Sequence, residues 1–583
     1  MRSRIVPAAL LACGAALALW LAWLGTAGVI GYRAPRLDPT LASATGYAWR
    51  GAVHVHTELS ADATGTVGEI AAAARRVGLD FVVLSDHTGA RGTAGRAVPG
   101  WYGSVLVLVG EEISTRDGHL LALAVSAHPY ALGPQARQAL EDIRVLGGAS
   151  WVAHPGGDPA WTAGLGGVAG IEVVSLSGAL DRLSMAQRLR ATLAYPASPS
   201  AAGLRVLSAR PPALDLWSAR TSLSGASLPR PLVAIGSVDA HGPVRGLGVP
   251  SYDIALGTVT TLVWMDEPPL PGVADRAVAG RLVRRLQSGR VAIELSAAGR
   301  APGTSFVATG SDGSNVLPGE TRSWGDGRWT LEARLGAPGD YTVLLLRDGE
   351  VVGRAEGTGL ELEAPAPGTY RIEVYRTTGP PGGGQPGATP WIISNPIYLW
   401  PAAAITAARV YPAPRLPAPQ TARPLLPEPG WAAESDALSA SAMAPMVDGL
   451  LWNVRVPSEA AADAFSAVAW RPEAAQDWSR TLGLTAGLSS EREWRVSMRV
   501  WTASENGEQT WELIVASSPE ATPTLSPWRR FRRIGADGQM VRGELLDEEL
   551  AQVTGVAFVA TPQRMRPGSQ VQIEIREVGV FGG

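Results

Sequence analysis

Residues 51–57 read Gly-Ala-Val-His-Val-His-Thr, and this stretch guides how the rest of the chain is interpreted. A short apolar strand is expected over Ala52–His56, and it ends on two histidines separated by one residue. Side chains two residues apart on a strand point to the same side, so the imidazoles of His54 and His56 can meet one ion. The first expectation is therefore a metal site at the end of a strand.

Around this stretch, apolar and polar segments alternate from Gly46 to about Ser296, which predicts an α/β fold with parallel strands. Continuous apolar runs, typical of buried parallel strands, lie at Phe81–Ser85, Val105–Val109, Leu120–Val125, Ser150–Ala153, Ile171–Val174 and Leu232–Ile235. Helices are expected over Val67–Val77, Arg276–Gln287 and, inside an insertion at residues 177–230, near Asp181–Leu193.

Histidines and carboxylates recur at the ends of these apolar runs, and all seven histidines lie between positions 54 and 241. The candidate metal ligands are His54, His56, Asp62, His87, Glu112, His119, His154, Asp239 and His241. In α/β barrels, active sites form at the C-terminal ends of the strands. Mixed His and carboxylate ligands suit zinc, manganese or iron. So many ligands would over-supply one ion, so two or three divalent metal ions are expected.

The ordered set of motifs resembles the PHP (polymerase and histidinol phosphatase) domain over about residues 46–295. The motifs are His54-Val-His56-Thr57 with Ser60 and Asp62, Ser85-Asp86-His87, Gly110-Glu-Glu112-Ile113-Ser114, Gly118-His119, Val152-Ala-His154-Pro155 and Ser237-Val-Asp239-Ala-His241. Two departures from the usual motifs are Ala61, which separates Ser60 from Asp62, and Val238, which follows Ser237.

The resemblance implies a distorted seven-stranded β/α barrel with up to three metals. It implies that His54, His56, Glu112 and Asp239 surround one ion, that Asp62, His87 and His241 surround a second, and that Glu112, bridging, with His119 and His154 holds a third. A metal-bound hydroxide would attack phosphorus in line, so no catalytic side chain separate from the metal cluster is expected. The implied activity is hydrolysis of a phosphomonoester or phosphodiester.

Other polar residues in this region have a weaker pattern. Arg91 and Arg96, in a Gly-rich loop after His87, are candidates for binding a phosphate, although a solvated loop is the commoner explanation. Glu111 is expected to face away from Glu112, in a supporting or solvated position. Glu172 is interpreted as structural and His128 as a surface residue.

The remainder of the chain predicts two all-β modules. Residues 297–400 are expected to form a small β-sandwich, residues 411–430 a stiff Pro-rich linker, and residues 431–583 a second, jelly-roll-like sandwich. Expected strands include Trp329–Leu335, Tyr341–Arg347, Leu360–Glu363, Thr369–Val374, Phe465–Trp470, Trp494–Trp501, Thr510–Val515 and Gln570–Val578. The tryptophans of the last module either pack its core, the commoner role, or form a sugar-binding platform.

Near the N-terminus, an uncharged run from Ile5 to Tyr32 is long enough to span a bilayer. Residues 1–36 are therefore expected to be an N-terminal transmembrane helix, with a cleaved signal as the alternative. A membrane-anchored protein with its catalytic domain outside the cytoplasm follows from this interpretation. Cys13 is the sole cysteine, so any metal must be held by His and carboxylates.

Three functions remain open. The first is a metal-dependent phosphoesterase acting on a phosphorylated small molecule or a surface polymer. The second is a degenerate barrel in a surface or glycan-binding protein, and the third is a metal hydrolase acting on an amide or another ester. The net charge of −3 gives no basic field for nucleic acid, so no nucleic-acid partner is expected.

Overall fold

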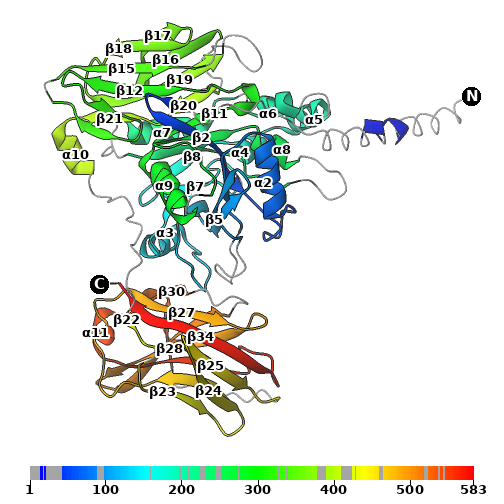
Figure 1. The fold of residues 1–583 in the computed structure, drawn as a ribbon, viewed down its shortest axis with the longest axis vertical. Helices are drawn as coiled ribbons and strands as arrows, with labels where there is room; N and C mark the ends of the chain where they lie inside the picture. The colour runs from blue at the N-terminus through cyan, green and yellow to red at the C-terminus, as the bar shows by residue number, and fades with distance from the viewer. Residues whose placement is uncertain are drawn as a thin grey trace, which may run out of the picture.

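The computed structural model describes most of the chain, as Figure 1 shows. The described residues are 14–17, 19–20, 42–87, 97–157, 159–195, 199–207, 209–223, 231–242, 251–272, 275–325, 327–336, 339–376, 389–408, 423–426, 428–458, 464–517, 523–535, 539–541 and 545–582.

A ring of strands forms the first part of the chain. In spatial order its strands are β2 (Gly46–Val55), β3 (Phe81–Leu84), β5 (Val105–Thr115), β6 (Gly118–Leu123), β7 (Ala149–Val152), β8 (Gly170–Ser175) and β9 (Val233–Ser237). The chain after β9 returns to β2, where the Ala240 amide donates to the His54 carbonyl at 3.2 Å and the Ala240 carbonyl accepts from the His56 amide at 2.9 Å. These bonds close the sheet into a barrel.

Strand β6 corrects the expectation that all these strands are parallel. It pairs antiparallel with both β5 and β7. The cause is a tight hairpin after Thr115, in which Gly118 adopts a φ of +111° that side chains rarely tolerate. Because β6 is reversed, its first residues lie at the same barrel edge as the last residues of β5 and β7.

Apolar side chains fill both faces of the barrel wall. One buried cluster joins Val53, Phe81, Leu108 and Trp151 from different strands with Leu282 of helix α9 (Asp275–Ser288), so it occupies the barrel interior. The opposite face of the strands packs on helices such as α2 (Val67–Arg76) and α3 (Ala136–Val145). Short strands β1 (Ala42–Ser43) and β4 (Gly100–Tyr102) extend the sheet, and α8 (Tyr252–Leu256) packs on α2.

The predicted insertion after β8 is helical. It contains α4 (Leu176–Asp181), α5 (Met185–Ala194), α6 (Pro199–Val206) and α7 (Pro212–Thr221). Serine side chains accept hydrogen bonds at the N-termini of α4 and α5, which explains where both helices begin.

The small all-β module shares a sheet with the barrel. Strands β10 (Thr260–Met265) and β11 (Val291–Glu294) extend the sheet from β2, and β11 pairs with β20 (Ile392–Ser394). The same sheet continues through β19 (Gly368–Arg376), β16 (Tyr341–Arg347), β17 (Glu350–Glu356), β21 (Ile397–Trp400) and β14 (Thr321–Ser323). A second sheet is formed by β13 (Asn315–Val316), β12 (Ser305–Gly310), β15 (Trp329–Arg334) and β18 (Gly359–Glu363). Two short helices flank the module, η1 (Ser296–Ala298) and α10 (Ala402–Ala408).

Two further sheets form the C-terminal part of the chain. One contains β22 (Arg423–Pro424), β24 (Ala440–Met446), β25 (Gly449–Arg455), β34 (Gln570–Phe581), β27 (Gly483–Ser489) and β30 (Thr524–Pro527). The other contains β23 (Trp431–Ser435), β26 (Ser466–Trp470), β33 (Val553–Ala560), β28 (Arg495–Ser504), β29 (Gly507–Ala516), β31 (Arg532–Ile534) and β32 (Met540–Val541). Two short helices complete it, η2 (Trp528–Arg530) and α11 (Asp547–Leu550). Trp452, Trp470, Trp478, Trp511 and Trp528 are buried in its core.

The predicted linker at residues 411–430 is partly structured. Residues 409–422 lie outside the described part, but β22 pairs with β34 and Leu425 is fully buried. The last residues of the expected linker therefore pack on the C-terminal sheets, because their apolar side chains complete that core.

The N-terminal expectation is corrected. Within the described residues, no helix is long and apolar enough to cross a membrane. Of the apolar run Ile5–Tyr32, the described residues are 14–17 and 19–20, and the rest lies outside the described residues. The finding overturns the transmembrane helix at residues 1–36 and the membrane-anchored localisation inferred from it.

Candidate metal centre

The structure brings the nine candidate ligands to one edge of the barrel. They follow or lie on different strands: His54 and His56 at the end of β2, His87 after β3, Glu112 on β5, His119 on β6, His154 after β7, and Asp239 and His241 after β9, with Asp62 in the loop after β2. His119 reaches this edge because β6 runs in the opposite direction. The ends of strands remote in sequence therefore meet around one space.

An irregularity at His54 turns the β2 histidines into that space. Val53 packs in the cluster inside the barrel, whereas Ala52 and Val55 pack in the cluster on the opposite face of the strands. The inside–outside alternation of side chains along β2 is therefore interrupted between Val53 and Val55. The pairing of β2 with β3 shifts register between Val53 and Val55, and His54 has a φ of +68°. Such a bulge redirects side chains and commonly lies beside functional sites.

Two other ligands share this backbone conformation. His154 has a φ of +25° and Asp239 a φ of +50°. A non-glycine residue in this region costs about 1–3 kcal/mol and persists where surrounding contacts hold it. The strained positions thus coincide with strand ends that point a ligand toward the same space.

Within the described residues, the ligand atoms form three overlapping groups that can each hold a metal ion. The groups are His54, His56, Glu112 and Asp239; His56, Asp62, His87 and His241; and Glu112, His119 and His154. In each group the ligand atoms lie within 4.8 Å of one another. Glu112 and His56 belong to two groups each, so the groups adjoin.

The most buried group has polar atoms that hydrogen bonds do not satisfy. Among the residues that the structure describes, His54 Nε2, His56 Nε2 and Asp239 Oδ1 are buried and have no hydrogen-bond partner. Nevertheless, Asp239 Oδ1 lies 3.3 Å from His54 Nε2 and 3.2 Å from His56 Nε2. Buried polar atoms rarely lack partners. These nitrogen and oxygen atoms point toward one another without forming hydrogen bonds. Ligands around a cation are arranged in this way, so these residues fit a metal ion.

The electrostatics of the metal-free cluster agree with this arrangement. Burial by itself lowers the pKa of His56, but the carboxylates of Asp239 and Glu112 outweigh it and raise the pKa to about 9. The pKa of His54 is raised for the same reason, and the imidazoles hold the pKa of Glu112 well below its usual range. Without metal, the raised pKa values favour protonated histidines. A bound cation would take the place of these protons.

The group around Asp62 is the most accessible. Asp62 Oδ2 lies 3.4 Å from His87 Nε2 and 3.3 Å from His241 Nε2, despite the Ala61 that separates it from Ser60. The side chains of His87 and His241 are about one-third exposed, and that of Asp62 is 48 % exposed. This group therefore opens to solvent, where a substrate can approach.

Residues that orient the ligands were only partly recognised from sequence. Glu172, interpreted as structural, accepts a hydrogen bond from His54 Nδ1 at 2.7 Å and another from the His154 amide at 2.7 Å. Ser60 Oγ lies 3.1 Å from His56 Nδ1 and donates to Asp86 at 2.9 Å. These contacts leave Nε2 of both histidines directed at the ion site. Glu172 lies within β8, and a carboxylate inside this apolar run was the available signal.

His128 does not lie on the surface as expected. It is fully buried, with Nδ1 2.7 Å from the Tyr130 carbonyl oxygen and Nε2 3.2 Å from Glu111 Oε1, so these partners replace the solvent. Glu111 is also fully buried, on the β5 face opposite Glu112, and is not solvated.

The expected phosphate-binding residues Arg91 and Arg96 lie outside the described residues. Among those described, Arg182 provides a cation near the ligands. It lines a pocket of about 190 Å³ together with His154 and Gly156. Arg182 follows α4, in the helical insertion, where no sequence motif marks it.

Comparisons with known proteins identify no family. No protein-family model matches the chain, and no curated protein matches it. Among solved structures, a two-domain protein from Bacteroides vulgatus containing a predicted PHP-like metal-dependent phosphoesterase is 15% identical, covers 59% of this chain and 95% of its own, and has a TM-score of 0.29. A family 11 carbohydrate-binding module from Clostridium thermocellum is 12% identical, covers 28% of this chain and 95% of its own, and has a TM-score of 0.23. Similarity at these scores does not establish a shared fold, so function rests on the residues of this chain.

Proposed function

We propose that the barrel hydrolyses phosphate esters with two or three divalent metal ions held by the nine clustered ligands. The observation that carries this proposal is the set of three adjoining ligand groups that share Glu112 and His56. The His and carboxylate ligand set suits zinc, manganese or iron. Ions bound there would lower the pKa of water and neutralise charge on the reacting oxygens.

Charge favours an anionic substrate. The ligand set contains three carboxylates, Asp62, Glu112 and Asp239, and two divalent ions already carry four positive charges. A third ion would bring the total to six positive charges and make the loaded site cationic, which suits a phosphate ester better than a neutral amide. Arg182 adds a guanidinium beside His154, and such a group can bind phosphate oxygens in a bidentate manner.

The test combines metal content with turnover in the full chain. We expect two or more equivalents of Mn, Fe or Zn by mass spectrometry, and hydrolysis of p-nitrophenyl phosphate or bis(p-nitrophenyl) phosphate. Both should be lost in a His54→Ala/Asp239→Ala variant whose circular dichroism remains native. Metal-free wild-type protein that stays inactive after metal is restored would reject the proposal in favour of a degenerate barrel. Turnover limited to carboxylate esters or amides would favour the alternative of a metal hydrolase that acts on an amide or another ester.

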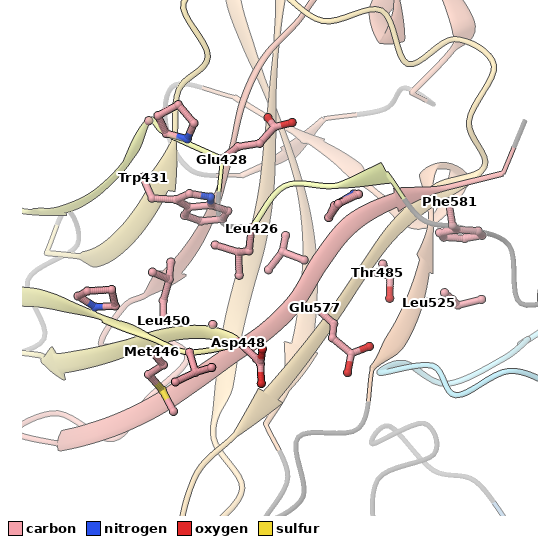
Figure 2. Close-up of a pocket in the computed structure, with 17 residues that line it drawn as sticks. Leu426, Glu428, Trp431, Met446, Asp448, Leu450, Thr485, Leu525, Glu577 and Phe581 are labelled. Atoms are coloured by element: carbon pink, nitrogen blue, oxygen red, sulfur yellow. The ribbon is translucent and has the colours of Figure 1, made fainter.

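A second candidate function concerns a groove of about 680 Å³ in the C-terminal part. Figure 2 shows the residues that line it. Its lining includes the half-buried indole of Trp431 and the carboxylates of Glu428, Asp448 and Glu577. An aromatic face with several hydrogen-bond acceptors suits a neutral polyhydroxylated polymer, whereas these charges oppose an anionic one. Retardation in gels containing neutral polysaccharide, reduced in Asp448→Ala/Glu577→Ala but not in Glu505→Ala/Glu548→Ala, would support this role.

A further inference from the structure

The C-terminal sheets contact the barrel through a short arm, residues 524–532. Figure 1 shows these sheets beneath the barrel, with β30 on the side nearest to it. The Leu525 amide donates to the Ala127 carbonyl at 2.7 Å, which joins β30 to the loop after β6. This junction lies outside the metal centre, and none of its residues is a candidate ligand.

Two arginines of the arm meet one buried carboxylate of the barrel. Asp142 on α3 is 1% exposed. Arg529 donates to Asp142 Oδ1 through Nε at 3.1 Å and Nη2 at 2.7 Å, and Arg530 Nη1 lies 3.5 Å from Oδ2. A buried carboxylate needs such partners, because an uncompensated buried charge is strongly unfavourable. The arm and the barrel are therefore matched in charge at this point.

Arg530 also holds the loop after β6. Its guanidinium lies over the Tyr130 ring at 4.4 Å from the centroid. It donates to the carbonyls of Ala131 and Gly133 in the same loop. One side chain of the C-terminal part thus fixes the position of a whole barrel loop.

That loop carries His128, which reaches the strand of the bridging ligand. His128 Nδ1 lies 2.7 Å from the Tyr130 carbonyl oxygen, and its Nε2 lies 3.2 Å from Glu111 Oε1. Both His128 and Glu111 are fully buried. Glu111 precedes Glu112 on β5, and successive side chains on a strand point to opposite faces. Holding Glu111 on one face therefore fixes the orientation of Glu112 on the other.

We propose that the C-terminal part sets the metal affinity of the barrel, with Arg529 and Arg530 as positioning residues that act through Asp142 and the His128–Glu111 pair. The inference rests on the proposed metal-dependent function. Glu112 belongs to two ligand groups, so a small displacement of β5 weakens both. Loss of supporting contacts around metal ligands typically reduces affinity about 10–100-fold.

The test compares an Arg529→Met/Arg530→Met variant with wild type in the full chain. Mn²⁺ affinity is measured by competition with a chromophoric chelator, and small-angle scattering reports whether the C-terminal part remains docked. The matched control is Arg499→Met/Arg564→Met, which removes two arginines that lie 3.4 and 3.5 Å from Glu512 within the C-terminal part. We expect affinity to fall about tenfold or more in the first variant and by less than about twofold in the control.

The outcomes separate this inference from the function beneath it. Wild type that binds Mn²⁺, with equal affinity in Arg529→Met/Arg530→Met, would overturn the positioning role alone. Wild type that takes up no metal would overturn the proposed function and this inference together. Should the double variant fail to fold, Arg529→Lys/Arg530→Lys and Asp142→Asn provide milder changes to the same contacts, and unchanged affinity in both would have the same negative meaning.

Discussion

At the scale of single residues, Glu172 orients two ligands without being one. It accepts hydrogen bonds from His54 Nδ1 and from the His154 amide. Glu172→Gln keeps the size but removes the charge and one acceptor, so we expect metal affinity to fall about 10–100-fold. Glu294→Gln, a fully buried glutamate that accepts from the Ala301 amide, is the control. Equal affinities in both variants, measured by chelator competition, would show that Glu172 is only structural.

A second residue-scale prediction concerns pH. Without metal, the pKa of His56 is raised to about 9, so its contribution to stability is complete below pH 6.5 and disappears as pH rises through about 9. The free energy of unfolding of the protein in chelator should fall by about 1–3 kcal/mol across this pH window. Metal needs neutral imidazole, so the stabilisation by added Mn²⁺ should grow over the same window. Thermal unfolding with and without chelator checks both trends, and parallel curves would contradict them.

Arg182 leads to a prediction about substrate binding. Its guanidinium lines the pocket beside His154, so it contacts the substrate phosphate in the proposed function. We expect Arg182→Gln to raise KM for p-nitrophenyl phosphate about tenfold while kcat changes little, because a charged hydrogen bond is lost in ground and transition states alike. Arg188→Gln, on the exposed side of α5, should leave KM unchanged. A fall in kcat alone would assign Arg182 a different role.

At the scale of elements, the sequence predicted the strands better than their directions. The apolar runs at 81–85 and 105–109 coincide with β3 and the start of β5, because burial on both faces leaves a continuous apolar run. Direction is not encoded in such a run, so antiparallel β6 was missed. The sequence also did not show which side chains of β2 face the barrel interior, since the bulge at His54 depends on contacts with β3 and β9. Spacing showed that His54 and His56 share a face, but not which one.

The reversed β6 depends on its hairpin, which yields an element-scale prediction. A Cβ on Gly118 would lie 3.0 Å from the Trp161 backbone, and φ is +111°. We expect Gly118→Ala to destabilise the protein by about 1–3 kcal/mol and to lower metal affinity by displacing His119. Gly164→Ala, with open space around its Cβ, is the control. Native stability and affinity in Gly118→Ala, by thermal unfolding and metal titration, would refute the dependence.

At the scale of the whole molecule, composition separated the α/β region from the all-β regions, but not how they join. After residue 297, alternating apolar residues separated by turn residues predicted strands that the structure contains, among them β15 and β16. The pairing of β11 with β20 links strands almost 100 residues apart, and periodicity within either strand carries no information about its partner. Within the described part of the chain, no helix is long and apolar enough to cross a membrane, contrary to the expectation for residues 1–36.

This joined sheet predicts how the molecule unfolds. Asn395 follows β20 and is 1% exposed. Its Oδ1 accepts from the Ala234 amide at 2.8 Å, and its Nδ2 donates to the carbonyls of Ala234 at 2.8 Å and Val291 at 3.1 Å. One side chain of the small module thus satisfies the backbone of β9 and β11. Asn395→Ala would leave these backbone groups unpaired and should lower the free energy of unfolding by about 2–4 kcal/mol.

The barrel and the small module should lose that stability together, as one cooperative unit. Denaturant unfolding followed by circular dichroism and by Trp fluorescence should shift to lower denaturant equally for both probes. Asn453→Ala, which removes an amide bonded to Gln572 on the C-terminal sheets, should leave this transition in place. Two separate transitions for the barrel and the small module would instead mean that β11 and β20 join domains that fold independently, and that the sheet is continuous without being cooperative.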